Sequence, residues 1–330
     1  MIQEIQEKID KSIDLIQRGE RLALMLSPDG YNVGVSGGKD SGVVLDLVKR
    51  AGVKYHAYYN VTGIDAPETV RFIRDNYPEV EFKHPEMNFF QIIEKWGMPN
   101  RIHPMCCKYM KEIVGVNQVV ITGARASESL SRSHYKDFEV VSKRKEHQYG
   151  HEVTIEGMIK NEHKCVKGKD VVMLHPILEW TASDVWEYTA ANNIPANPLY
   201  CHVPRVGCMF CPKAPKGQRQ WYMDNYPTYL KRYKLALQRY LESARNSTPF
   251  TDVDTYIEWS FSHDGPMLAW LNNRPSPSEE KMERERRRAW GLAVESLMMG
   301  EDFPFHSSVL EERKEIINRA KTYVRKMLTK

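Results

Sequence analysis

The spacing of apolar positions changes repeatedly along the first two hundred residues. Ile2, Ile5, Ile9, Ile13 and Ile16 recur at helical spacing, which predicts an amphipathic N-terminal helix that docks on the rest of the chain. Short apolar runs then alternate with helical patterns. The predicted strands cover residues 31–35, 55–61, 80–84, 119–122 and 171–174, and the predicted helices cover residues 42–50, 67–76, 88–96 and 181–192. This alternation predicts an α/β fold with a doubly wound, mostly parallel sheet and ligands at the carboxyl ends of its strands.

Changes in the pattern divide the chain into three predicted regions. Residues 1–29 form the docking helix, and residues 30–215 form the sheet domain. Residues 216–330 form a helical C-terminal region that ends in an amphipathic stretch at 309–328. A polar segment at about 133–170, rich in His, Lys and Glu, is expected to be a hairpin-like insertion over the sheet edge. The stripe Tyr222, Tyr226, Tyr229 and Tyr233 has the spacing of a helix buried on one face, and stacking on nucleic acid is the alternative.

Composition narrows the functional classes. The 330 residues are 42% hydrophobic and 27% charged, which is typical of a soluble globular protein. No apolar run is long enough for a membrane span and no signal-peptide pattern opens the sequence, so we expect a cytoplasmic, reducing location. Six cysteines in that setting favour metal binding or catalysis over disulfides. The net charge of +4 does not by itself indicate nucleic-acid binding.

A phosphate-binding loop is predicted at Ser36-Gly37-Gly38-Lys39-Asp40-Ser41, between a strand and a helix. Glycines there let the backbone approach a polyphosphate, while helix N-terminal amides point at it. The serines add hydroxyl donors, and Lys39 adds a positive charge. The segment resembles the S-G-G-x-D-S loop of the ATP pyrophosphatase group, the adenine nucleotide α-hydrolases. That resemblance implies ATP as ligand, with Mg²⁺ on the phosphate oxygens.

Two pairs of cysteines are candidate metal ligands. Cys106 and Cys107 are adjacent, and Cys208-Met209-Phe210-Cys211 is a C-x-x-C motif. Four thiolates brought together by the fold could hold either zinc or a [4Fe–4S] cluster. From the residues alone, both metals remain open.

Several ordered motifs resemble the phosphoadenosine phosphosulfate (PAPS) reductase family over residues 30–215. They are Val120 to Arg132 for I-T-G-x-R-x-x-[EQ]-S-x-x-R, Trp180 to Trp186 for W-T-x-x-D-V-W, Asn197 to Tyr200 for N-P-L-[HY], and Gly207 to Cys211 for G-C-x-x-C. Thr62 to Thr69 is similar to the family's D-T-G-x-x-F-P-E-T, with Val61 in place of the first aspartate.

The resemblance implies ligands and site residues. In the adenosine phosphosulfate (APS) reductase branch, a Cys-Cys pair and a distant C-x-x-C ligate one [4Fe–4S] cluster, which carries over to Cys106, Cys107, Cys208 and Cys211. Zinc on Cys208 and Cys211, with Cys201 or His202 nearby, is the alternative. Cys201 is an extra thiol that could be a ligand or a sulfur-carrying nucleophile, whereas Cys165 is expected to be incidental.

The same motifs give nucleotide-binding residues at the ends of the predicted strands. Thr62 and Gly63 follow one strand, and Gly123 and Arg125 follow another. Arg125 and Arg132 are expected to clamp phosphate or an acidic substrate, because arginine pairs bidentately with such oxygens. Ion pairing with Glu128 is the alternative for both arginines.

Two features favour the ATP-cleaving, DndC-like branch of the family over its reductases. The loop at 36–41 keeps every position of S-G-G-x-D-S, and no E-C-G-[IL]-H segment with a reactive cysteine follows Cys211. This branch implies adenylation of an acceptor, tRNA, DNA or a small molecule, for sulfur transfer from a donor protein, within a homo-oligomer or a modification complex. Lys39, Asp40, Arg125 and Cys201 are then the catalytic candidates. The alternatives are an APS or PAPS reductase that uses Cys201, and a non-catalytic nucleotide-binding component.

Overall fold

The computed structural model divides the chain into two compact units, residues 1–246 and 247–330. It describes residues 2–100, 104–111, 118–129, 132–142, 154–160, 170–246, 248 and 250–261. The stretch at 309–328, Cys165 and most of the predicted insertion lie outside the described residues. The three predicted regions therefore stay a prediction, although the first compact unit extends beyond residue 215 and includes two further helices.

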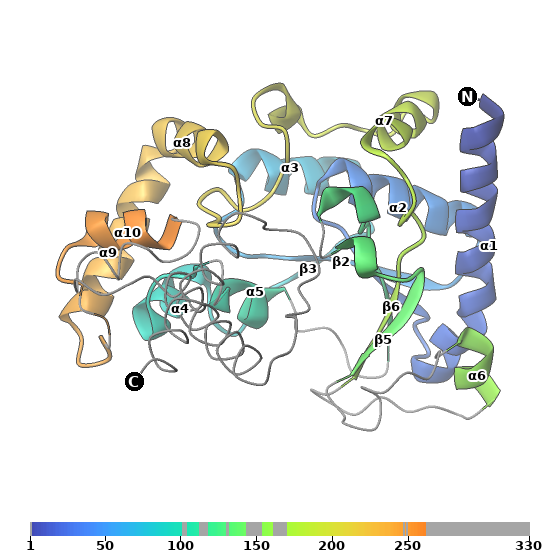
Figure 1. Ribbon diagram of the computed structural model, residues 1–330, viewed down its shortest axis with the longest axis horizontal. Helices are drawn as coiled ribbons and strands as arrows, with labels where there is room; N and C mark the ends of the chain where they lie inside the picture. Colours follow the sequence, from blue (N-terminus) through green and yellow to red (C-terminus); the bar gives the residue numbers. More distant parts are fainter. Residues whose placement is uncertain are drawn as a thin grey trace, which may run out of the picture. The chain divides into compact units, whose positions relative to one another are not determined.

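The centre of the first unit is a six-stranded sheet with the order β3-β2-β1-β4-β6-β5 (Figure 1). Its strands are β1 (Tyr31–Gly34), β2 (Tyr55–Asn60), β3 (Glu81–Lys83), β4 (Val119–Ile121), β5 (Phe138–Ser142) and β6 (Asp170–Leu174). Every pairing is parallel except β5 with β6. The predicted α/β fold with a mostly parallel sheet is confirmed.

The strand order places a switch point between β1 and β4. From β1 the chain builds outward through β2 and β3, and then returns to add β4 on the other side of β1. In an open parallel sheet, the crevice outside such a point is where ligands bind. The loops after β1 and β4 carry Ser36 and Arg125, so both predicted nucleotide-binding segments start at this crevice.

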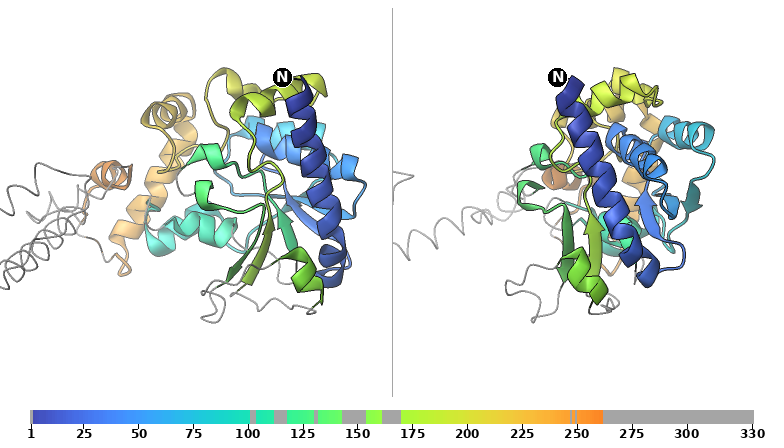
Figure 2. Two further views of the ribbon diagram at one scale, coloured as in Figure 1. Left: turned by 45° about the vertical axis from the view of Figure 1, so that its right-hand side comes forward. Right: turned by 90° about the vertical axis from the view of Figure 1, so that its right-hand side faces the viewer.

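Helices flank the sheet on both sides, with α1 and α2 along one side and α4 and α5 along the other (Figure 2). The helices of this unit are α1 (Ile2–Leu26), α2 (Lys39–Ala51), α3 (Pro67–Asn76), α4 (Phe89–Trp96), α5 (Met105–Met110), α6 (Ile155–Lys160), α7 (Ala182–Ala191), α8 (Lys216–Asn225) and α9 (Pro227–Glu242). In the second unit the described helix is α10 (Val253–Phe261). Capping boxes at Asn88 and Thr181 fix where α4 and α7 begin.

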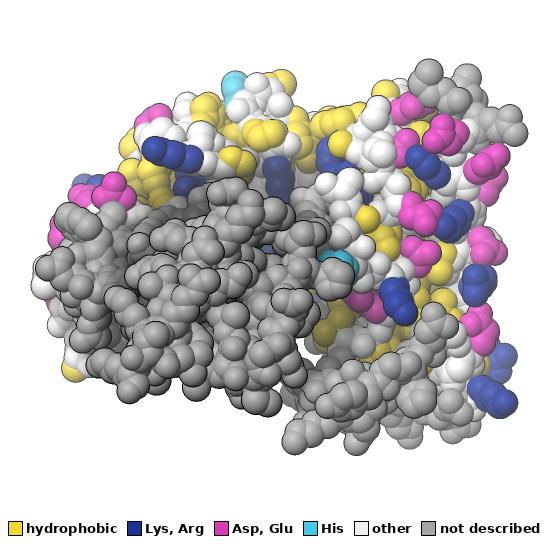
Figure 3. All heavy atoms as spheres, in the orientation of Figure 1, with side chains coloured by type: hydrophobic (Ala, Val, Ile, Leu, Met, Phe, Trp, Pro, Cys, Tyr) yellow, Lys and Arg dark blue, Asp and Glu magenta, His cyan; other side chains and the backbone are white. Residues whose placement is uncertain are grey.

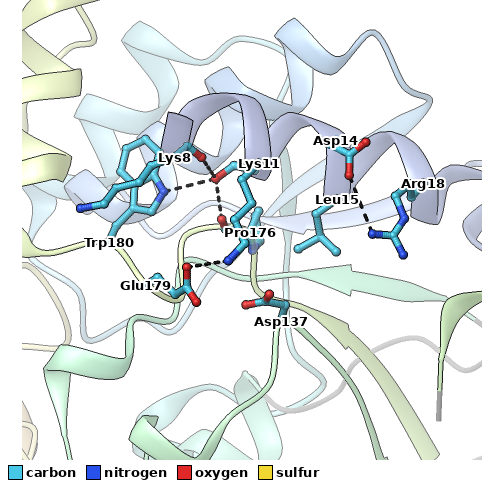
Figure 4. A pocket seen from close by; sticks show the side chains of 10 residues that line it. Lys8, Lys11, Asp14, Leu15, Arg18, Asp137, Pro176, Glu179 and Trp180 are labelled. Atoms are coloured by element: carbon cyan, nitrogen blue, oxygen red, sulfur yellow. Dashed lines mark hydrogen bonds and ion pairs between the residues drawn. The ribbon is translucent and has the colours of Figure 1, made fainter. Parts of the chain in front are cut away.

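The N-terminal helix docks on the sheet domain as its isoleucine pattern predicts. Ile9 and Ile16 are buried in the core of the unit. The Ser12 hydroxyl lies 2.6 Å from the Pro176 carbonyl oxygen and accepts the Trp180 indole N–H at 3.2 Å (Figure 4). The outward face of α1 carries side chains of both charges interspersed (Figure 3), which is typical of a solvated helix.

Two local features add to the predictions. Part of the polar segment after residue 133 is β5, which pairs with β6 from Phe138 opposite Leu174 to Ser142 opposite Asp170 and so completes the sheet edge. The tyrosine stripe lies on two helices instead of one. Pro227 lacks an N–H and restricts the residue before it, so α8 ends at Asn225 and α9 begins at Pro227. Tyr222 and Tyr233 are fully buried, which agrees with core packing.

Candidate functional site

The phosphate loop connects β1 to α2 and is stabilised from within. Gly37 has a φ of 72°, and a Cβ there would lie 2.8 Å from the Thr69 Cγ2, so only glycine fits. The Ser41 hydroxyl donates to the Gly38 carbonyl at 2.9 Å and lies 3.2 Å from the Ser36 hydroxyl. Gly38, the N-cap of α2, has no side chain with which to satisfy the first amides of the helix. The Lys39 N–H donates to the Tyr200 hydroxyl, and the amides that follow it suit an anion.

Three predicted catalytic residues meet at the start of α2. The Asp40 carboxylate accepts from the Lys39 ammonium at 2.8 Å and from the Arg125 Nε at 2.6 Å. Arg125 is buried and reaches Asp40 from the loop after β4. Gly123 permits this approach, because a Cβ there would lie 3.0 Å from the Asp40 carbonyl carbon. Two cations thus share one carboxylate, and the group keeps a net positive charge beside the phosphate loop.

Arg132 is engaged by the chain itself. Its Nη1 pairs with the Glu128 carboxylate, the alternative that the sequence left open. Burial lowers the pKa of Arg132, and the nearby Arg205 guanidinium lowers it further. Arg205 is exposed, and the charges of Asp40, Arg205 and Arg125 all act on Tyr200. Sequence reasoning missed Arg205; its one signal was its place two residues before Gly207-Cys208.

A buried histidine fixes the loop that carries Arg125. His175 follows β6 and is fully buried. Its Nδ1 lies 2.7 Å from the Thr122 hydroxyl at the end of β4, and its Nε2 lies 3.1 Å from the Glu139 carboxylate on β5. Burial lowers the pKa of His175 despite this carboxylate. The ends of three neighbouring strands are therefore connected through one imidazole.

The loop after β2 bonds to the C-x-x-C segment. The buried Thr62 hydroxyl donates to the Asp65 carboxylate at 2.8 Å, and the Tyr59 hydroxyl donates to the same oxygen at 2.5 Å. Asp65 forms a backbone bridge with Cys208, and the Met209 N–H donates to the Ile64 carbonyl at 3.0 Å. Thr62, a predicted nucleotide-binding residue, thus has its proton engaged by Asp65, while the neighbouring Gly63 has a φ of 74°.

The other three predicted metal ligands all act on Cys106. A hydrogen bond to Cys107 and burial raise the pKa of Cys106, and Cys208 and Cys211 add to that effect. Burial also raises the pKa of Cys208, while the Lys111 ammonium beside it acts in the opposite direction. Within the described ranges, no three cysteine, histidine or acidic side chains already have metal-coordinating geometry. Cys201 differs from these four thiols because it is exposed.

A short helix connects this thiol to the phosphate loop. Pro198–Cys201 forms one 3-10 turn, capped by the Asn197 side chain. The Asn197 amide donates to the Gly37 carbonyl at 3.1 Å, and the Lys39 N–H donates to the Tyr200 hydroxyl at 2.8 Å. The predicted N-P-L-[HY] motif therefore contacts the phosphate loop twice, which the sequence could not reveal.

Comparison with protein families agrees with this geometry. Residues 30–214, more than half of the chain, match the phosphoadenosine phosphosulfate reductase domain. The chain belongs to the phosphoadenosine phosphosulfate reductase domain family. The family match covers the switch-point crevice and both pairs of cysteines. In the part of the chain that the structure describes, no helix is long and apolar enough to cross a membrane.

Individual relatives are distant. The chain is 24% identical over 261 residues to an uncharacterised protein of Methanocaldococcus jannaschii, covering 72% of this chain but only 57% of that protein. It is 24% identical over 187 residues to adenosine 5'-phosphosulfate reductase 2 of Bacillus subtilis, covering 53% of this chain and 69% of the relative. A PAPS reductase structure from Candida auris aligns with a TM-score of 0.40 and 17% identity, over 64% of this chain and 97% of that one.

Proposed function

We propose that this member of the PAPS reductase family binds an adenylyl sulfonucleotide and cleaves it reductively with Cys201 as the attacking thiol. The observation that carries the proposal is the place of Cys201. It is exposed and directly follows Tyr200, whose hydroxyl accepts a hydrogen bond from the phosphate loop. The named relatives support the substrate class, since the B. subtilis relative is an APS reductase. This ranking reverses the sequence-based preference for ATP cleavage.

The proposed reaction has two steps. The Cys201 thiolate attacks the sulfur of the substrate, a bond forms between Sγ and that sulfur, and the bond to the phosphate oxygen breaks with its electron pair on the leaving AMP. Lys39 and Arg125 would stabilise the charge on the phosphate oxygens, since both cations lie at the start of α2. An external dithiol then attacks the Cys201 Sγ. It expels sulfite and supplies two electrons as it becomes a disulfide.

The test is sulfite release from APS and PAPS with dithiothreitol as reductant. We expect sulfite and AMP in equal amounts from APS, and a sulfonated Cys201 by mass spectrometry when the reductant is left out. Cys201→Ser should abolish both signals, whereas Cys165→Ser serves as the matched control and should retain them. Sulfite formation that persists in Cys201→Ser would refute the assignment of the nucleophile.

A second candidate function is cleavage of ATP between the α- and β-phosphates, with Mg²⁺ and adenylation of an acceptor such as tRNA or DNA. It is favoured by the loop at Ser36–Ser41, where the first amides of α2 have no side-chain cap from Gly38. ATP–pyrophosphate exchange separates the two functions. Exchange with no sulfite release would establish the ATP-cleaving function, and a sulfur donor protein would then be the expected partner.

We further infer that Cys106, Cys107, Cys208 and Cys211 hold a [4Fe–4S] cluster, with zinc as the alternative. The effects of Cys107, Cys208 and Cys211 on the pKa of Cys106 support a common site, and a thiol that binds a metal gives up its proton. When bound, such a cluster would give a rigid, charged support beneath the C-x-x-C segment. Lys111 lies beside Cys208, where its positive charge complements a thiolate ligand.

A further inference from the structure

The Tyr200 hydroxyl accepts a hydrogen bond from a backbone N–H of the phosphate loop. The Lys39 N–H belongs to the first turn of α2, where backbone amides lack partners within the helix. It donates to the Tyr200 hydroxyl at 2.8 Å, across a sequence separation of 161 residues. A Cβ on Gly38 would lie 3.4 Å from the same hydroxyl. Tyr200 therefore lies directly over the two residues at the turn of the loop.

The Tyr200 side chain is held firmly in that place. Its ring packs edge-to-face on Trp186, with ring centroids 5.0 Å apart and planes at 81°. Its backbone N–H donates to the Asn197 carbonyl at 3.1 Å. The Asn197 amide in turn reaches the Gly37 carbonyl and the Thr69 hydroxyl. These contacts hold the Tyr200 hydroxyl in its position at the phosphate loop.

The proton of this hydroxyl is available to a ligand. A phenol oxygen can accept hydrogen bonds while its own proton is donated elsewhere. The Lys39 amide occupies an acceptor position, and within the described residues the hydroxyl has no further hydrogen-bond partner. Burial raises the pKa of Tyr200 to about 12, so the phenol keeps its proton at neutral pH. Accepting from a helix N-terminal amide also polarises the O–H bond and strengthens it as a donor.

We propose that Tyr200 is a ligand-binding residue of the phosphate loop, whose hydroxyl donates to the anionic group that lies beyond the α-phosphate of the bound nucleotide. This group is the sulfuryl group of APS or the β-phosphate of ATP. The assignment rests on the proposed function. Tyr200 shares one 3-10 turn with Cys201, and its hydroxyl already lies at the Lys39 N–H, where the outer group of a bound nucleotide is expected. The charges of Arg205 and Arg125 favour an anion there, and the opposing charge of Asp40 is paired with Lys39 and Arg125.

The proposal predicts selectivity between nucleotides. Tyr200→Phe keeps the ring against Trp186 and removes only the hydroxyl. We expect it to weaken APS and ATP binding by roughly 10- to 100-fold, the usual loss for one hydrogen bond to a charged group. Binding of AMP, which lacks the outer group, should change by less than about 2-fold. A residue that only supported the loop would affect all three nucleotides equally.

Isothermal titration with APS, ATP and AMP tests this pattern, in the full chain carrying Cys201→Ser so that APS is bound without being cleaved. Tyr188→Phe is the matched control, because its hydroxyl donates to Asp46 at 2.6 Å, away from the loop. It should leave all three affinities unchanged, and thermal unfolding confirms that both variants fold. Equal losses for AMP and APS, or affinities that stay the same or increase in Tyr200→Phe, would overturn the assignment while the nucleotide site stands. If the native chain binds none of the three, the proposed function and the assignment of Tyr200 both fail.

Discussion

Replacing Gly37 with alanine perturbs the phosphate loop at its most constrained point. Two separate penalties apply there. The φ of 72° is a left-handed conformation, which costs a residue with a Cβ about 1–2 kcal/mol. The new Cβ would also lie 2.8 Å from the Thr69 Cγ2 and 3.2 Å from Ile73, and such overpacking costs about 1–3 kcal/mol. We therefore expect Gly37→Ala to lower the free energy of unfolding by about 2–5 kcal/mol.

Gly52 provides a control that separates the two penalties. Its φ of 69° nearly equals that of Gly37, but no described atom lies within 4 Å of a Cβ built there. Gly52→Ala should therefore show only the conformational cost, about 1–2 kcal/mol. The effect of alanine on the unfolded chain is the same in both variants and cancels from their difference. That difference measures the crowding against Thr69.

Urea unfolding at 25 °C provides the measurement, with Thr69→Ser as the third variant. Serine removes the Cγ2 and keeps the hydroxyl that accepts from Asn197. We compare the effect of Thr69→Ser on the free energy of unfolding in two backgrounds. In Gly37→Ala it should be more favourable than in the native chain by at least about 1 kcal/mol. Equal losses for Gly37→Ala and Gly52→Ala would refute the reasoning, because crowding would then contribute nothing.

Three further predictions concern charge, pH and metal. Arg125→Gln should lower the free energy of unfolding by about 2–4 kcal/mol, because Asp40 loses a buried partner. A urea titration that shows a loss under about 0.5 kcal/mol would contradict this. Burial lowers the pKa of His175 from 6.5, so the unfolded chain binds the extra proton. The free energy of unfolding, measured by urea titration at each pH, should have its full value above about pH 7 and decline toward pH 5. His175→Gln should make that decline smaller. Anaerobic protein should contain about four irons per chain, which Cys208→Ser should lose and Cys165→Ser retain; one zinc per chain by elemental analysis would refute the iron–sulfur assignment.

Local structure was predictable where turn and capping residues define it. Pro67 marks the start of α3, as the structure shows. Thr181 and Asp184 form the predicted capping box of α7. The edge strand β5 was less predictable, because a short half-buried run among polar residues takes its conformation from pairing with β6.

The site was predictable as a set of residues but not as a set of contacts. Asp40 and Arg125 were each expected in the site, yet their ion pair joins positions 85 residues apart and depends on the strand order. The motif that contains Tyr200 was visible, whereas its bond to Lys39 was not. Arg205 was missed because a single exposed arginine has no periodic signal, and its place shortly before the C-x-x-C motif was its one indication.

The distances along the chain between partners at the phosphate loop have a consequence for biosynthesis. Asn197 bonds to Gly37 across 160 residues, and Tyr200 bonds to Lys39 across 161. At ribosomal rates of about 5–20 residues per second, the loop leaves the tunnel roughly 8 to 30 seconds before the turn that covers it. During that interval the nascent chain has the glycine-rich turn without its tyrosine and asparagine contacts. Nucleotide binding should therefore become detectable only late in synthesis. The moment at which it appears in a translation reaction would mark the folding of the complete domain.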